Sequence, residues 1–150
     1  MKWLLDTNVV SETIRRQPRE CVISWIARHR PDEMTISLIT VAEIRNGIGS
    51  APESNRRKLM RWLESDVESK FAERILPLTT EVLIDWLQMS RKLAAERMLR
   101  RAADLLIAST ARVHGLTLVT RNVRHFADTG VIVYDPWDGK THVMDAPDAR

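Results

Sequence analysis

The sequence predicts an α/β fold: a single domain with a central parallel sheet of about four to five strands, flanked by helices on both faces. Short apolar runs typical of buried strands alternate along the chain with longer segments in which apolar residues recur at helical spacing. Such alternation is typical of parallel sheets covered by helices. The length of 150 residues and the hydrophobic content of 44% suit one compact domain.

Five segments have the composition of short strands. The third contains Pro77, which suits an edge strand or a strand end because proline lacks the N–H that a sheet ladder uses. The fourth alternates apolar and β-branched residues. The predicted strands are Trp3–Leu5, Met34–Ser37, Ile75–Leu78, Leu116–Thr120 and Val131–Tyr134.

The segments between these strands have helical patterns, and two of them end at Gly47 and Gly115, where a left-handed cap forms easily. The domain is expected to end near residue 137. Residues 138–150 are polar without a clear period, and they are expected to form a flexible C-terminal tail. The predicted helices are Val9–Arg16, Glu20–His29, Thr40–Gly47, Ser54–Phe71, Glu81–Met98, Ala103–His114 and Asn122–Ala127.

The charge balance is mildly basic, with a formal net charge of +3 and a pI of about 9.4, which alone does not indicate a nucleic-acid partner. Its distribution says more, because cations flank Asp104 and follow the fourth predicted strand, where a phosphate-bearing substrate would need them. A further basic group around Arg57 is equally well explained as a solvated helix face. The flanking cations are Arg91, Lys92, Arg97, Arg100, Arg101, Arg121 and Arg124.

Cys21 is the only cysteine, so the sequence offers neither a disulfide framework nor a cysteine-based zinc site. Its apolar neighbours predict a core position, and its isolation suits a reducing cytosol. Lys2 and Asp6 interrupt the N-terminal apolar run too early for a signal peptide, and no apolar stretch approaches membrane-spanning length. A cytoplasmic protein without a membrane partner is therefore expected.

Three acids stand near the ends of predicted elements. Asp6 directly follows the first strand, at the edge of a parallel sheet where active sites form. Glu43 lies in an apolar stretch, and Asp104 begins an apolar helix. Each acid also has a structural interpretation. Asp6 and Asp104 are favoured at helix N-termini, and Glu43 can form a capping box with Thr40.

Three acids beside hydrophobic elements fit a shared site better than three unrelated caps. Carboxylates gathered in one pocket repel one another and need a cation or protons, and hard oxygen ligands select Mg²⁺ or Mn²⁺ over zinc. Bound Mg²⁺ can orient a water for in-line attack on phosphorus and stabilise the leaving oxygen. The hydroxyls of Thr7 and Thr120, near the same edge, could hold a metal-bound water or orient a carboxylate.

Four segments, in this order along the chain, resemble the PIN-domain family. Their spacing is similar to that of VapC-type toxins of toxin–antitoxin pairs, in the FitB-like branch, and the resemblance runs from about Lys2 to Trp137. It therefore implies a PIN domain over residues 1–137. The segments are Leu4-Leu5-Asp6-Thr7-Asn8-Val9-Val10-Ser11-Glu12, Thr40-Val41-Ala42-Glu43-Ile44, Ala103-Asp104-Leu105-Leu106-Ile107-Ala108 and His114-Gly115-Leu116-Thr117-Leu118-Val119-Thr120-Arg121-Asn122-Val123-Arg124.

The resemblance implies a Mg²⁺- or Mn²⁺-dependent endoribonuclease that cuts single-stranded or loop RNA. It implies a homodimer and a cognate antitoxin, which typically plugs the site and carries its own DNA-binding domain. Asp6 and Asp104 would be metal ligands, and Glu43 would be a third ligand or would position the attacking water. Thr120 completes the catalytic set; candidate supporting residues are Thr7, Asn8, Asn122 and His125, and candidate RNA contacts are Arg97, Arg100 and Arg121.

The sequence departs from this branch at one point. Members usually carry a further acid after the fourth strand, whereas Asn122 and His125 occupy the matching positions here and Asp128 lies out of register. We therefore expect at most one tightly bound Mg²⁺. His125 could instead contact the scissile phosphate, or it could be a partly exposed residue of a short helix.

Two other functions compete with the nuclease. The missing acid motivates a catalytically weakened PIN-fold protein that acts mainly through complexes with its antitoxin and operator DNA. A phosphate enzyme such as a receiver or phosphatase would need a nucleophilic Asp and usually a Lys, but the strand ends offer Arg121 and no Lys. The sequence also has no glycine-rich nucleotide loop of the GxGxxG or GxxxxGK[ST] kind.

Overall fold

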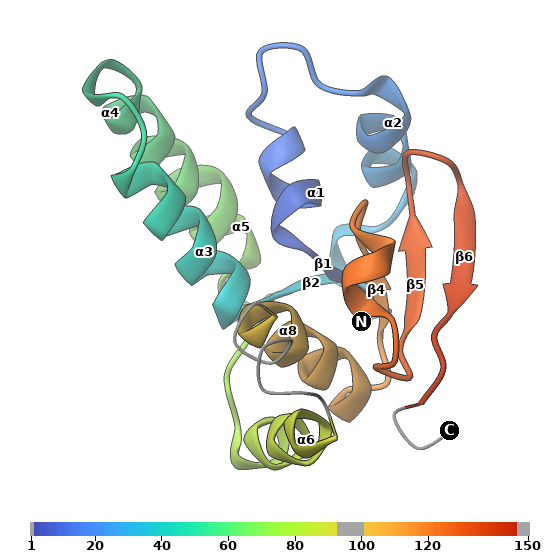
Figure 1. Ribbon diagram of the computed structural model, residues 1–150. Coiled ribbons are helices and arrows are strands. Elements are labelled where there is room, and N and C mark those ends of the chain that lie inside the picture. Colours follow the sequence, from blue (N-terminus) through green and yellow to red (C-terminus); the bar gives the residue numbers. More distant parts are fainter. Residues whose placement is uncertain (1, 93–100, 147–150) are drawn as a thin grey trace.

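The computed structural model describes residues 2–92 and 101–146, and within them six strands form one sheet (Figure 1). The strands stand in the order β3-β2-β1-β4-β5-β6. The first five are parallel, and β6 runs antiparallel to β5. The strands are β1 (Trp3–Leu5), β2 (Met34–Ser37), β3 (Ile75–Leu76), β4 (Thr117–Val119), β5 (Ile132–Asp135) and β6 (Lys140–Val143).

Helices connect the parallel strands and lie on both faces of the sheet (Figure 1). The segment Leu63–Glu68 is π-helical and joins α4 to α5, and short 3₁₀ turns cover Pro31–Glu33, Ala72–Arg74 and Val123–Phe126. The α-helices are α1 (Thr7–Glu12), α2 (Glu20–Arg28), α3 (Leu38–Gly49), α4 (Glu53–Trp62), α5 (Ser69–Phe71), α6 (Thr80–Arg91) and α8 (Ala102–Val113).

Two hydrophobic cores form because neighbouring residues of a strand point to opposite faces of the sheet. Leu4 and Leu118 pack with residues of α6 and α8 on one face. Leu5 and Val119 pack with residues of α1, α2, α3 and α4 on the other. Burial on both faces explains why these strands are almost wholly apolar in sequence. The predicted α/β fold with helices on both faces is confirmed.

The sixth strand was not predicted from the sequence. Residues 140–143 were expected to belong to a flexible tail, but they form the antiparallel edge strand β6. A turn directs the chain back onto β5: Gly139 has a φ of 74° and its N–H donates to the Asp135 carbonyl at 2.8 Å. The strand is held by main-chain pairing and is largely exposed, so it shows no apolar alternation. Residues 147–150 lie outside the described residues.

Some predicted boundaries also differ from the observed ones. The predicted helix Ser54–Phe71 is three successive helical segments. For the predicted helix Glu81–Met98, the structure describes α6 up to Arg91, and residues 93–98 lie outside its described part. Cys21 is exposed rather than in the core, because α2 turns its neighbour Val22 inward. None of the helices within 2–92 and 101–146 has the length and apolar character needed to cross a membrane.

Candidate active site

Asp6 lies at the carboxyl end of β1, between β1 and the neighbouring strand β4. Its backbone is extended, its N–H donates to the Val119 carbonyl at 3.0 Å, and the side chain is only 4% exposed. Asp6 caps α1 by accepting the Thr7 N–H at 2.8 Å, so its structural interpretation is correct. The second carboxylate oxygen accepts from the Thr120 hydroxyl at 2.6 Å and from the Asn8 amide at 2.8 Å.

Glu43 is free of the capping role that the sequence suggested. The cap of α3 is Ser37, whose hydroxyl accepts the Ile39 N–H at 3.2 Å, so the helix begins at Leu38, two residues before the expected start at Thr40. Thr40 is then an interior residue of the helix. Glu43 accepts a hydrogen bond from the Thr7 hydroxyl. Thr7 therefore bonds to two acids at once, to Asp6 through its N–H and to Glu43 through its hydroxyl.

Asp104 lies in the first turn of α8, where the residue at the cap position, Arg101, makes no side-chain capping bond. The side chain of Asp104 is 20% exposed, and one carboxylate oxygen lies 3.2 Å from Nδ1 of His125. A protonated His125 would form an ion pair with it. The interpretation of Asp104 as a dipole-favoured residue of the first turn is compatible with this contact.

The three carboxyl groups share one electrostatic environment. Burial raises the pKa of Asp6, although hydrogen bonds from Thr120 and Thr7 oppose it and the charge of Asp104 raises it further. Burial also raises the pKa of Glu43, with the hydrogen bond from Thr7 opposing and the charges of Asp6 and Asp104 adding to it. Burial raises the pKa of Asp104, while the nearby His125 and Arg101 lower it. Burial therefore disfavours the ionised form of all three acids, a penalty that a bound cation would offset.

This donor set suits a hard divalent cation by its chemistry, because it offers carboxylate and hydroxyl oxygens. It is nevertheless loose: among residues 2–92 and 101–146, no group of three His, Cys, Asp or Glu side chains is arranged to hold a metal ion by itself. Mg²⁺ commonly keeps several waters and uses only one or two carboxylates together with substrate phosphates. The residues fit an ion held in that way.

Some of the other predicted site residues belong to the hydrogen-bond network of Asp6, and the rest do not. Thr120 and Asn8 belong to the hydrogen-bond network of Asp6, because the Asn8 amide also donates to the Thr120 hydroxyl at 2.9 Å. Asn122 contributes its main-chain N–H to the Thr120 hydroxyl at 3.0 Å. Arg121 places its guanidinium over the Trp137 ring, 5.7 Å from the centroid. Arg97 and Arg100 lie outside the described residues.

Two residues near the site were missed as individual candidates. The Arg101 guanidinium donates to the carbonyls of His125 and Ala127 and so holds the turn that carries His125. Glu12 is 2% exposed and accepts the Arg19 N–H at 2.7 Å. Burial opposes its ionisation, but hydrogen bonds from Arg19 and Arg15 outweigh it and lower the pKa of Glu12. The sequence signals were the position of Arg101 just before Asp104 and that of Glu12 at the end of the segment that begins at Leu4.

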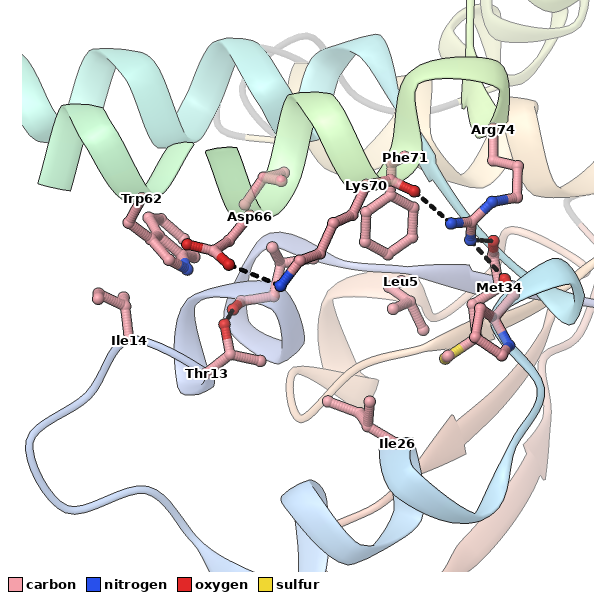
Figure 2. A pocket seen from close by; sticks show the side chains of 13 residues that line it. Leu5, Thr13, Ile14, Ile26, Met34, Trp62, Asp66, Lys70, Phe71 and Arg74 are labelled. Carbon is pink, nitrogen blue, oxygen red and sulfur yellow. Dashed lines mark hydrogen bonds and ion pairs between the residues drawn. The ribbon is translucent and has the colours of Figure 1, made fainter. Parts of the chain in front are cut away.

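An apolar cavity of about 520 Å³ lies apart from these acids (Figure 2). It is lined by side chains such as Leu5, Ile26 and Trp62, with charged groups that are already engaged. Lys70 lies 2.6 Å from a carboxylate oxygen of Asp66, as the dashed line in Figure 2 shows. Arg74 donates to main-chain carbonyls, including that of Met34 at 2.7 Å. This lining does not suit a phosphodiester, which needs available cations.

Comparison with known proteins identifies the family. The PIN domain profile matches residues 3–134. Toxin FitB of Neisseria gonorrhoeae is 36% identical over 89% of this chain and 97% of its own length. VapC ribonuclease Y4jK of Sinorhizobium fredii is 32% identical over 90% of this chain and 97% of its own.

Two solved structures agree with this result. The crystal structure of FitAcB from Neisseria gonorrhoeae contains a chain 36% identical, with a TM-score of 0.79, over 90% of this chain and 98% of that one. The structure of FitAB bound to an IR36 DNA fragment contains a chain 34% identical, with a TM-score of 0.77, over 90% and 95%. The sequence profile, the relatives and the shared fold together show that this chain belongs to the PIN-domain family.

Proposed function

We propose that this protein is a divalent-metal-dependent endoribonuclease that acts as the toxin of a toxin–antitoxin pair. The observation that carries the proposal is the pair of hydrogen bonds that Thr7 donates to Asp6 and Glu43. These bonds lie beside the carboxyl ends of β1 and β4. Asp104 adds a third carboxyl group whose charge acts on both. Relatives named toxin and VapC ribonuclease support the same activity.

Each acid has a separate role in the proposed reaction. Asp6 and Asp104 would hold a Mg²⁺ or Mn²⁺ ion, which when bound supplies an activated water and stabilises the leaving oxygen. Thr120 and Asn8 fix the carboxylate of Asp6 through hydrogen bonds of 2.6 and 2.8 Å. Glu43, with its raised pKa, would accept the proton of the water that attacks phosphorus; the bond from phosphorus to the leaving ribose oxygen would break, and that oxygen would take a proton from solvent water.

The proposed partners follow from the family. FitB has been solved together with FitA and with DNA. We infer that this chain likewise binds a cognate antitoxin, forms a homodimer, and acts on RNA in the cytoplasm. Light scattering of the purified chain, alone and with the product of a neighbouring reading frame, tests these assemblies; a strictly monomeric chain that binds no such product would contradict them.

A catalytically weakened PIN-fold protein is the second candidate function. It is favoured by His125, which contacts Asp104 where the branch usually has another acid, and by the absence of a ready three-ligand cluster among the described residues. Such a protein would act through its complex with antitoxin and operator DNA. It would bind the antitoxin and operator DNA, and it would not cut RNA whichever divalent metal is added.

Cleavage of a labelled single-stranded RNA by purified protein distinguishes the two. We expect cleavage with Mg²⁺ or Mn²⁺, none with EDTA, and loss of at least about a hundredfold in kcat for Asp104→Asn, because the ion would lose a ligand. Asp32→Asn is the matched control, since Asp32 is an exposed acid paired with Arg30. Cleavage in EDTA, or full activity of Asp104→Asn, would overturn the metal site; intact RNA in every metal would favour the weakened protein.

A further inference from the structure

A polar cavity of about 610 Å³ opens between the turn after β4 and the β5–β6 hairpin. We call it the hairpin pocket. Four of its lining residues carry or can carry positive charge: Arg121, Arg124, His125 and His142. Its volume falls within the range of about 300–1000 Å³ that is usual for small-ligand sites. In contrast to the apolar cavity of Figure 2, its surroundings suit an anionic ligand.

The hairpin pocket adjoins Asp104 and the hydrogen-bond network of Asp6. His125 lines the pocket and lies 3.2 Å from the Asp104 carboxylate. The N–H of Arg121 donates to the Asn8 side chain at 3.2 Å. A polynucleotide whose scissile phosphate lies at the acids can therefore place a neighbouring nucleotide in the pocket.

The acids of the pocket already have partners. Asp138 accepts the Lys140 N–H at 2.9 Å and lies 3.6 Å from the Lys140 ammonium. Asp135 is buried and accepts the Trp137 N–H at 2.8 Å. Both carboxylates therefore interact with groups of the hairpin itself.

The donors of the pocket are less engaged. Among residues 2–92 and 101–146, the Arg124 guanidinium makes no hydrogen bond or ion pair, and Nε2 of His142 is buried without a hydrogen-bond partner. The Arg121 guanidinium lies over the Trp137 ring, with 5.7 Å between the guanidinium carbon and the ring centroid, and a contact of this kind leaves its N–H groups for a ligand. Available cations beside an unpartnered ring nitrogen suit a phosphate joined to a hydrogen-bonding base.

We propose that the hairpin pocket binds the nucleotide next to the scissile phosphate of a single-stranded RNA, which rests on the ribonuclease function proposed above. Arg121 and Arg124 hold its phosphate, and His142 contacts the edge of its base. Phosphate contacts position a strand without regard to sequence, whereas base contacts select it. The two kinds of residue therefore affect binding differently.

Binding of fluorescein-labelled RNA in EDTA tests the pocket independently of cleavage. We expect Arg124→Ala to raise Kd about five- to tenfold for all homo-oligomers. The slope of log Kd against log salt concentration should fall by about 1, because one phosphate contact is lost. His142→Ala is expected to change the relative affinity for rA, rC and rU oligomers. Arg57→Ala, which removes an equal charge from exposed α4, is the matched control and should leave Kd within twofold.

Cleavage kinetics with Mg²⁺ complete the test. We expect Arg124→Ala to raise KM by a similar factor and to leave kcat within about twofold, because the residue binds substrate away from the acids. Arg124→Ala with unchanged Kd, an equal loss in Arg57→Ala, or no RNA binding by the unsubstituted chain would each overturn the pocket. A selective loss of binding in a chain that never cuts RNA would keep the pocket and overturn the ribonuclease.

Discussion

Thr7 is the residue that joins two of the three acids. Its N–H is fixed by the start of α1, and its hydroxyl bonds to Glu43 of α3. A rotation of either acid therefore requires a change at Thr7. A side chain that orients an ion's ligands commonly affects affinity or activity as strongly as a weak ligand does.

Thr7→Val keeps the size of the side chain but removes the hydroxyl. We expect kcat for RNA cleavage to fall about 10- to 100-fold, because Glu43 loses the bond that directs it. Thr7→Ser restores the hydroxyl and should recover most of the activity. Steady-state kinetics measures both variants. Wild-type kcat in Thr7→Val would show that the bond to Glu43 does not position the acid.

Asp6 makes the stability of the metal-free protein depend on pH. Burial raises its pKa in the folded state above the value of about 3.9 in an unfolded chain. The folded state then binds more protons, so Asp6 lowers stability as pH rises from the unfolded pKa through the raised folded one. At neutral pH the ionised, buried carboxylate is destabilising unless a cation offsets it.

Asp6→Asn removes this penalty. In EDTA we expect the variant to be more stable than wild type at pH 7, with the difference shrinking toward pH 4. Urea unfolding at several pH values measures it, and adding Mg²⁺ should stabilise only the wild type. A variant that is less stable than wild type at pH 7, by an amount independent of pH, would show that the hydrogen bonds of Asp6 outweigh its burial.

The places of Asp6 and Thr120 at the ends of strands could be predicted from the sequence, but their hydrogen-bond partners could not. Asp6 and Thr120 follow apolar runs that read as buried strands, and the carboxyl ends of adjacent parallel strands meet. The bond from Thr7 to Glu43 depends on where α3 begins, which no residue near Glu43 reveals. Likewise, the contact of Arg121 with Trp137 depends on the hairpin after β5, far along the chain.

At the scale of elements, the start of α3 decides what Glu43 can do. Both Ser37 and Thr40 are residue types that cap helices, and Thr40 with Glu43 matches the capping box. In the structure Ser37 ends β2 with extended backbone and caps α3, so Thr40 already lies within the first turn of the helix. Short-range patterns could not choose between them, because the choice depends on where β2 leaves the sheet.

A pair of substitutions tests this start. We expect Ser37→Ala to lower the free energy of unfolding by about 1 kcal/mol, since a cap bond is lost. Thr40→Val should be neutral or slightly stabilising, because within the described part of the chain its buried hydroxyl has no partner. Denaturant unfolding measures both. The opposite order of effects would mean that Thr40 is the cap and that Glu43 serves the helix end.

For the whole molecule, alternating apolar segments were enough to predict a parallel sheet between two layers of helices. They could not predict β6, because an exposed edge strand buries too little to leave an apolar pattern. That strand is consequential, since it forms one side of the hairpin pocket through His142. The acids and the hairpin pocket lie at the carboxyl ends of the parallel strands. Segments from β1, α3, α8 and the β4–β5 connection supply their residues.

The central claim is that Asp6, Glu43 and Asp104 serve one divalent ion. Titration of metal-free protein with Mn²⁺, followed by electron paramagnetic resonance of the free ion, tests it most directly. We expect one tight site in wild type and Asp32→Asn, and an affinity at least about tenfold weaker in Asp6→Asn and Asp104→Asn. Affinity equal to wild type in both of these variants, or no Mn²⁺ binding by wild type, would contradict the shared site.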